Sequence, residues 1–272
     1  MPELPEVETV RQGLSSWVAG QSVTQVKSFR SDLRFPLPVD LSARLSGRVC
    51  RHIGRRGKYL LFDFGDVILV WHLGMTGQFH VLPVGAPQGR HEHLRIDLAS
   101  GQSLRYRDMR RFGYLGLLQP GELVTHPWFA SLGPEPLGPE FSAGYLNKVC
   151  QGRKAPIKNV LMDARVVVGV GNIYACESLY RATILPMRPA STLSAKEGAA
   201  LVAEVQAVLE AAIAAGGSSI SDFVQVDGKP GYFAHDFKVY GRAGQLCGRC
   251  GGMIERCVLA GRGTFYCNGC QH

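Results

Sequence analysis

Apolar residues recur at two different spacings along this chain, and each spacing dominates a different part of it. Between residues 22 and 118, short runs rich in β-branched and aromatic residues alternate with turn residues, which is typical of β-strands. Gly65-Asp66 and Ser100-Gly101 supply hairpin turns between neighbouring runs. This region is predicted to fold as an antiparallel sandwich or barrel, with strands at 23–26, 59–64, 67–73, 93–98, 104–107 and 114–118.

Helical spacing precedes and follows this strand-rich region. Near the start, Val7, Val10, Leu14 and Trp17 recur at helical spacing and predict an N-terminal helix. A proline-rich stretch at 119–141 is interpreted as an interdomain linker. Beyond the linker, the pattern predicts helices at 142–151, 156–163, 172–181 and about 195–215.

The last of these helices has the clearest boundaries. Ser194 and Glu197 form a capping box at its start, and Gly216-Gly217 follows its end. The apolar stripe between these signals is expected to pack in a core and not to hold a cofactor; it consists of Leu201, Val205, Val208, Leu209 and Ala212.

Composition adds a basic character to this two-part pattern. The chain has 272 residues, of which 46% are hydrophobic and 19% charged, as in globular proteins with one large or two ordinary domains. Lys and Arg outnumber Asp and Glu by 30 to 22, which gives a net charge of +8. The sequence pI of about 9.2 lies in the range that favours a nucleic-acid partner.

Two Cys-x-x-Cys pairs near the end of the chain are the strongest single chemical signal. Cys247 and Cys250 are followed, after a gap of 16 residues, by Cys267 and Cys270, and this spacing fits a four-thiolate zinc site in a reducing compartment. Four protein thiolates complete a tetrahedral shell and leave no position for water or substrate. We therefore predict one structural zinc ion. Cys257, between the pairs, has no partner at this spacing.

The opening residues Met1-Pro2-Glu3 allow two interpretations. Removal of Met1 would leave the secondary amine of Pro2 as the chain terminus beside the carboxylate of Glu3, and such an amine can attack an electrophilic carbon to form an iminium. Proline is also common in the first turn of a helix, where acidic residues complement the helix dipole. Taken alone, these residues favour a helix start over an active site.

Two segments of the strand-rich region carry apolar residues in a setting that suits insertion into a base stack. Phe112 follows Arg110 and Arg111, and Met75 has glycines on both sides. Minor-groove proteins insert apolar wedges between bases, and enzymes that act on a base must extrude it. Each residue taken alone is more typical of core packing. His91 is a candidate phosphate contact.

A second anion site is expected in the helical region. Arg153 and Lys158 lie at the start of one short helix, and Gly169-Val170-Gly171-Asn172 opens the next. Two helix N-termini joined by a glycine-containing turn present backbone N–H groups that can cradle an anion. With Lys158 and Asn172 beside these groups, phosphate gripping is the better interpretation.

Eight separate segments, in order, resemble the formamidopyrimidine-DNA glycosylase family of bifunctional DNA repair enzymes. The similarity covers nearly the whole chain and rests on residues 2–9, 58–60, 72–75, 110–113, 132–137, 168–174, 227–233 and the terminal finger. The related endonuclease VIII branch shares the Pro-Glu start, a helix-two-turns-helix motif and the finger, but Leu4 and segment 227–233 resemble the purine-lesion branch. Cys257 and Asn268-Gly269 depart from the common finger pattern.

The resemblance implies an α+β fold in four parts. A β-sandwich with an N-terminal helix is expected at 1–118 and the linker at 119–141. A helix-two-turns-helix domain is expected at 142–246, with a lesion-recognition loop at about 218–240, and the zinc finger at 247–272. The implied partner is duplex DNA with oxidised bases or abasic sites. The protein is expected to act as a monomer. Because the sequence shows no targeting signal and no apolar run of about 18 residues, it is expected in the bacterial cytoplasm or nucleoid, without membrane contact.

The resemblance also implies roles for individual residues. Pro2 attacks C1′ of an extruded nucleotide, and Glu3 assists sugar-ring opening. Lys58 donates a proton in the first strand-cleaving elimination, and Arg262 assists the second. The remaining DNA-binding positions are His91, Arg110, Arg153, Lys158, Asn172, Met75 and Phe112, of which Met75, Arg110 and Phe112 fill the gap left by the extruded base.

The implied reaction is removal of oxidised purines, such as 8-oxoguanine and formamidopyrimidines, followed by β,δ-elimination of the strand. Two alternatives stay open on the sequence alone. One is an oxidised-pyrimidine glycosylase of the endonuclease VIII type. The other is a protein that binds damaged DNA without performing chemistry.

Overall fold

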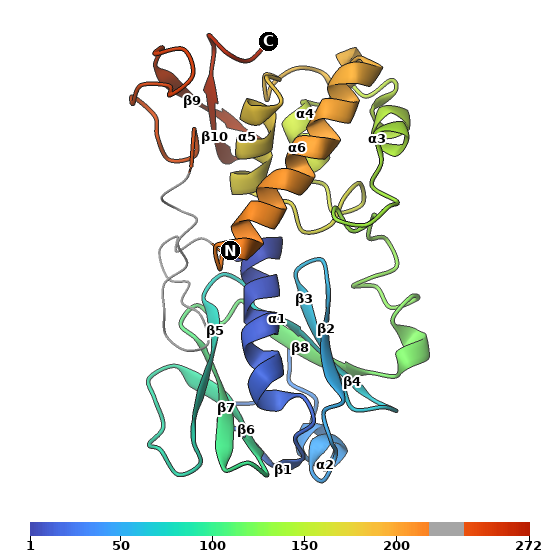
Figure 1. The fold of residues 1–272 in the computed structure, drawn as a ribbon. Coiled ribbons are helices and arrows are strands. Elements are labelled where there is room, and N and C mark those ends of the chain that lie inside the picture. Colours follow the sequence, from blue (N-terminus) through green and yellow to red (C-terminus); the bar gives the residue numbers. More distant parts are fainter. Residues whose placement is uncertain (218–236) are drawn as a thin grey trace. The chain divides into compact units, whose positions relative to one another are not determined.

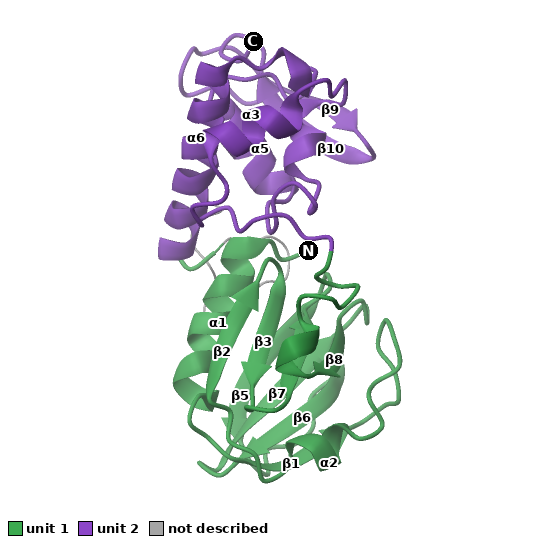
Figure 2. Cartoon of the chain, turned by 90° about the vertical axis from the view of Figure 1, so that its right-hand side faces the viewer, with its two compact units in different colours: residues 1–130, 216–232 green, residues 131–215, 233–272 purple. Residues whose placement is uncertain are grey.

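The chain folds into two compact units in a computed structural model that describes residues 1–217 and 237–272 (Figure 2). Of the described residues, 1–130 and 216–217 belong to the first unit, and 131–215 with 237–272 belong to the second. The division falls within the predicted linker at 119–141, whose role stays a prediction. Most of the predicted lesion-recognition loop at about 218–240 lies outside the described residues.

The first unit is an antiparallel sandwich with two four-stranded sheets (Figure 1). One sheet has the strand order β1-β6-β7-β5 and the other β2-β3-β4-β8. The predicted α+β fold with a β-sandwich is therefore confirmed. The strands are β1 Val23–Ser28, β2 His52–Arg56, β3 Tyr59–Asp63, β4 Ile68–His72, β5 Gly77–Pro83, β6 Glu92–Leu98, β7 Gln102–Asp108 and β8 Tyr114–Leu118.

Two of these strands, β2 and β5, are absent from the sequence prediction. Both lie at the edge of their sheet, so each pairs with a single neighbouring strand. In β2 only Ile53 is buried, and β5 buries only Gly77 and Phe79. Because few of their side chains enter the core, the apolar alternation that marks a strand is weak in both.

Helix α1 (Leu4–Val18) contributes one face to the core of the sandwich and packs against β2 and β3. Val7, Val10 and Leu14 are buried as expected, but the expectation that Trp17 continues this stripe is wrong, because its side chain is 45% exposed. Val18 takes that place at 2% exposure. With 3.6 residues per turn, Val18 lies about 20° around the helix from Val7, whereas Trp17 lies about 80° from it. A short helix that the sequence analysis did not predict, α2 (Leu41–Leu45), is the other α-helix among the described residues of this unit.

The described residues of the second unit form four α-helices, and each begins close to a predicted start. Their bounds are α3 Ala143–Cys150, α4 Ile157–Leu161, α5 Asn172–Arg181 and α6 Ala195–Ala214. The capping box at the start of α6 is present: the Ser194 hydroxyl accepts from the Glu197 N–H, and Glu197 accepts from the Ser194 N–H at 2.8 Å. Short 3₁₀ turns occur at Pro120–Glu122, in the first unit, and at Ala190–Thr192.

The cysteine-rich end of the chain is part of the second unit's core. Strands β9 (Ile254–Leu259) and β10 (Arg262–Cys267) form an antiparallel hairpin, and β10 packs against α5. The Gln271 side chain joins the finger to the turn that follows α5. It donates to the Ile184 carbonyl at 2.8 Å and accepts from the Cys267 N–H at 2.8 Å. Among the described helices, none has the length and apolar character needed to span a membrane.

Candidate functional site

The start of the chain forms the helix start that its sequence favoured. Glu3 is the N-cap of α1 and is 4% exposed, while Pro2 is half-buried in front of it. The Glu3 N–H donates to the Glu6 carboxylate at 2.8 Å, which satisfies a donor that a helix start leaves free. The Glu3 side chain in turn accepts from the backbone N–H of Glu6, so a capping box fixes the helix end directly after Pro2.

A chain of ion pairs connects α1 to the turn that carries Lys58. Glu8 on α1 accepts from Arg11 and from Arg55, whose Nε lies 3.0 Å from the Glu8 carboxylate. Arg55 Nη1 also donates to the Gly57 carbonyl at 2.9 Å. Burial works to raise the pKa of Glu8, but the hydrogen bonds from Arg11 and Arg55 outweigh it and lower the pKa. The charged Glu8 thus ties the helix to the residue that precedes Lys58.

His72, at the end of β4, adds no positive charge near Lys58. Burial, followed by the charges of Lys58 and Arg34, lowers the pKa of His72 to about 4. The neutral ring stacks on Tyr114 with 4.8 Å between ring centroids. Its Nδ1 accepts from the Gly74 N–H at 3.0 Å. The segment that leads to Met75 therefore begins at a fixed, uncharged side chain.

Three loops of the first unit bring together four residues that the sequence singled out. Met75 lies in the loop between β4 and β5, and Arg110 and Phe112 lie in the loop between β7 and β8. The Phe112 ring is 42% exposed, and the Arg110 guanidinium lies 4.7 Å from its centroid. His91, before β6, has a positive φ of 59°, and its carbonyl accepts from the Asp108 N–H. An exposed phenyl ring with a cation over its face suits a stack of bases.

In the second unit, Lys158 joins the helix pair to the finger. Its side chain is fully buried, and the ammonium group donates to Asn172 Oδ1 and to Thr264 Oγ1, each at 2.6 Å. Asn172 in turn donates to the Gly263 carbonyl at 2.9 Å. These bonds hold β10 at Gly263 and Thr264. The first residue of the strand, Arg262, directly precedes them and is exposed. Arg153 is also exposed, in the turn before α4.

Thr264 had no sequence signal of its own, because a threonine is an ordinary residue in a strand. We expect Thr264→Val to destabilise the second unit by about 1–3 kcal/mol, since the buried ammonium of Lys158 loses an acceptor. Thr264→Ser, which keeps the hydroxyl, is the matched control. Thermal unfolding of the three proteins checks this prediction, and equal unfolding midpoints for the wild type and the valine variant would contradict it.

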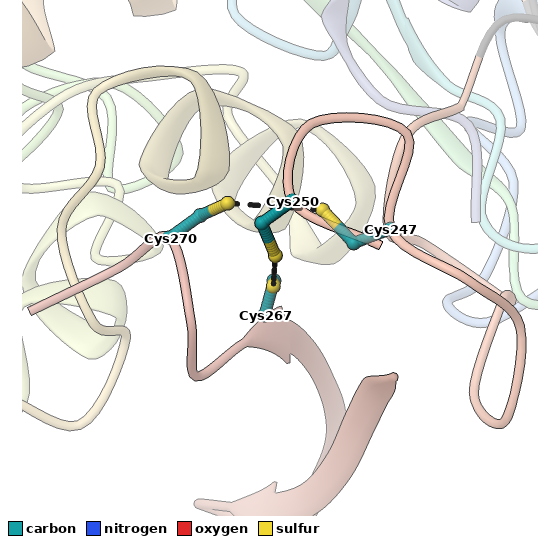
Figure 3. Close-up of side chains that lie close together, drawn as sticks. All are labelled: Cys247, Cys250, Cys267 and Cys270. Atoms are coloured by element: carbon teal, nitrogen blue, oxygen red, sulfur yellow. Dashed lines mark hydrogen bonds between the residues drawn. The ribbon is translucent and has the colours of Figure 1, made fainter. Parts of the chain in front are cut away.

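The four predicted zinc ligands form one cluster in the finger (Figure 3). Their Sγ atoms all lie within 4.8 Å of one another, with 3.8 Å between Cys247 and Cys270 and 3.4 Å between Cys250 and Cys267. A tetrahedral zinc ion with bonds of about 2.3 Å separates its sulfur ligands by about 3.8 Å, so the cluster fits zinc. Cys257 lies on β9 opposite Thr264, outside the cluster.

The surroundings of the cluster favour thiolate at Cys247. Burial works to raise the pKa of this thiol, but the hydrogen bond from the Tyr180 hydroxyl and nearby backbone N–H groups outweigh it and lower the pKa to about 6. The Tyr180 oxygen lies 3.2 Å from Cys247 Sγ. Because Tyr180 belongs to α5, the metal site and the helix pair are parts of one packed structure.

Three family models match successive segments of the chain. Residues 1–115 match the formamidopyrimidine-DNA glycosylase N-terminal domain, residues 132–224 match the formamidopyrimidine-DNA glycosylase H2TH domain, and residues 244–272 match a zinc finger found in FPG and IleRS. The finger match and the cysteine cluster together confirm one structural zinc ion.

Individual relatives match from end to end. A formamidopyrimidine-DNA glycosylase of Laribacter hongkongensis is 50% identical over 272 residues, with 100% of both chains covered. A Lactococcus lactis FPG mutant in complex with a Fapy-dG containing DNA superposes with a TM-score of 0.93 at 33% identity and 100% coverage of both chains. A MutM structure with carbocyclic 8-oxo-G containing DNA gives a TM-score of 0.92 at 34% identity, again with 100% coverage of both chains. Both the sequence and the fold therefore show that this chain belongs to the formamidopyrimidine-DNA glycosylase family.

Proposed function

We propose that this protein is a base-excision repair enzyme that removes oxidised purines, 8-oxoguanine and formamidopyrimidines, from duplex DNA and then cleaves the strand. The observation that carries the proposal is the full-length match to named formamidopyrimidine-DNA glycosylases and to structures with Fapy-dG or 8-oxo-G DNA. Its partner is duplex DNA with oxidised bases or abasic sites. It acts as a monomer on the chromosome, in the nucleoid.

The proposed chemistry begins at Pro2 once Met1 has been removed. Its secondary amine attacks C1′ of the damaged nucleotide, the bond to the base breaks, and Glu3 assists opening of the sugar ring. The resulting iminium withdraws electrons from C2′ and acidifies its proton, so the 3′ phosphate can leave. The burial of Glu3 at the helix start supports an acid whose position is fixed.

Cations complete the proposed mechanism. Lys58 donates a proton in the first elimination and Arg262 assists the second, and positive charge around the departing phosphates stabilises them. His91, Arg110, Arg153, Lys158 and Asn172 are the proposed DNA contacts, while Met75, Arg110 and Phe112 fill the space that the base vacates. The exposure of Arg153 and Arg262 supports their part in this set. Because Lys158 is fully buried, its proposed part in DNA binding is exerted through its bonds to Asn172 and Thr264, which fix the helix pair against the finger.

A comparison of two lesions tests the proposal. We expect faster excision of 8-oxoguanine than of thymine glycol from otherwise identical duplexes, measured under single-turnover conditions. Faster excision of thymine glycol would favour the endonuclease VIII alternative. DNA binding without excision of either lesion, and without a borohydride-trapped adduct, would favour the non-catalytic alternative.

A further inference from the structure

The buried carboxylate of Asp108 lies where the loops that carry Met75, His91 and Phe112 come together. Asp108 is fully buried at the end of β7. A buried charge of this kind is costly unless several donors satisfy it. The donors around Asp108 come from separate loops, so its hydrogen bonds determine how those loops are placed relative to one another.

One carboxylate oxygen holds the loop between β4 and β5. The Thr76 hydroxyl donates to Asp108 Oδ1 at 2.5 Å, and the same Thr76 oxygen accepts from the Arg110 N–H at 3.0 Å. A single hydroxyl therefore bridges the residue after Met75 to the backbone of the Arg110 loop. Removal of this hydroxyl leaves a buried carboxylate oxygen and a backbone N–H without their shared partner.

The other carboxylate oxygen holds the end of the Arg110 loop. The Gly113 N–H donates to Asp108 Oδ2 at 2.7 Å, and the Tyr106 hydroxyl lies 3.3 Å from the same oxygen. Burial, followed by the charge of Asp108, raises the pKa of Tyr106 well above its usual value, so its hydroxyl keeps the proton that it can donate. Phe112 is thus attached to a backbone position that the carboxylate fixes.

The backbone of Asp108 reaches the third loop. Its N–H donates to the His91 carbonyl at 3.1 Å, and its carbonyl lies 2.8 Å from His93 Nε2. His91 has a positive φ of 59°, a conformation that a non-glycine residue keeps only when its surroundings hold it. The bond to Asp108 is one such restraint.

The first two loops pack against each other without a gap. A Cβ added at Gly74, whose φ is +66°, would lie 2.3 Å from the Gly113 nitrogen and from the Phe112 carbonyl carbon. A Cβ added at Gly113 would lie 1.8 Å from the Tyr106 hydroxyl. The two loops therefore touch backbone to backbone beneath the exposed Phe112 ring.

We propose that Asp108 and Thr76 are positioning residues that join the Met75 loop and the Arg110–Phe112 loop into one preformed wedge, which enters the DNA as a unit when the base is extruded. The inference rests on the proposed function. The wedge is rigid before DNA binds, so inserting it costs little ordering entropy. Asp108 is fully buried and Thr76 partly buried, and neither is proposed to contact a base.

The test separates extrusion from the later chemistry. Stopped-flow fluorescence of 2-aminopurine beside 8-oxoguanine follows the loss of base stacking, and borohydride trapping on an abasic duplex follows a reaction with no base to extrude. We expect Thr76→Val to slow the fluorescence change and the excision about tenfold, as the loss of one buried hydrogen bond predicts. Trapping on abasic DNA should stay within about twofold of the wild type. Thr76→Ser should restore extrusion, and Thr125→Val, at a surface turn, should change neither reaction.

A second variant provides an independent test in case Thr76→Val does not fold. Asp108→Asn keeps the side-chain shape but turns an N–H group toward one of the present donors, and the same selective slowing is expected. Normal extrusion in both folded variants would overturn the inference, as would equal slowing of extrusion and abasic trapping. If the wild-type protein fails to trap abasic DNA, the proposed function is refuted instead.

Discussion

Replacement of Pro2 by glycine is expected to reduce borohydride trapping on 8-oxoguanine DNA by about 10²-fold or more, because the nucleophile loses its secondary amine and its fixed position. Glycine keeps a terminal amine, so the variant tests the ring and its placement and not merely the presence of nitrogen. The half-buried position of Pro2 in front of the Glu3 helix cap is the structural basis for a fixed attack geometry. The readout is the amount of covalent protein–DNA adduct in a single turnover.

Pro5→Ala is the matched control for this experiment. Pro5 lies in the first turn of α1 and has no free amine, so its replacement should leave trapping close to the wild-type amount. The state of Met1 gives a second control, since mass spectrometry reports whether it has been removed. A protein that retains Met1 and still forms the adduct at the wild-type rate would rule out Pro2 as the nucleophile.

Loss of one zinc ligand is expected to have the second large effect. Cys247→Ser should abolish stoichiometric zinc and weaken binding to lesion DNA severely, because structural zinc sites contribute about 10–16 kcal/mol of apparent binding energy that is also folding energy. Cys247 also lies in the hydrophobic cluster that joins the finger to Cys176 and Tyr180 of α5, so loss of the metal loosens this part of the second unit. The measurements are zinc per chain by elemental analysis and DNA affinity by fluorescence anisotropy.

Cys257→Ser separates the metal site from the effect of a lost thiol. Cys257 lies on the finger hairpin, only ten positions from Cys247, yet its side chain is outside the cluster of four sulfur atoms. This variant should keep one zinc ion per chain and wild-type affinity for DNA. Full zinc content and unchanged affinity in Cys247→Ser would contradict a structural role for the metal.

Sequence patterns were most successful where a local feature sets the structure. The spacing of Cys247, Cys250, Cys267 and Cys270 predicted the metal cluster, because each pair needs only a tight turn to bring two sulfur atoms together. The bounds of α6 followed from a capping box and a glycine pair at its ends. Strands β2 and β5 were not predicted, because few of their side chains are buried and their sequences therefore show little apolar alternation.

Local sequence patterns did not predict the contacts that organise the candidate site. The Lys158 ammonium bonds to Thr264, which is 106 residues away, and Arg55 reaches back 47 residues to Glu8. Asp108 meets Thr76 across 32 residues. In each case the residue types were ordinary for their position, so nothing local marked them as partners.

By itself, the sequence determined five of the six described α-helices, most of the strands, the zinc ligands and membership in a DNA-repair family, since periodicity, caps and motif spacing act over a few residues. Only the tertiary structure decided that Lys158 is buried between two helices and the finger, and that Asp108 draws three loops together. The physical reason is that a buried charge must find its partners wherever the folded chain brings them, and distance along the sequence does not limit that choice.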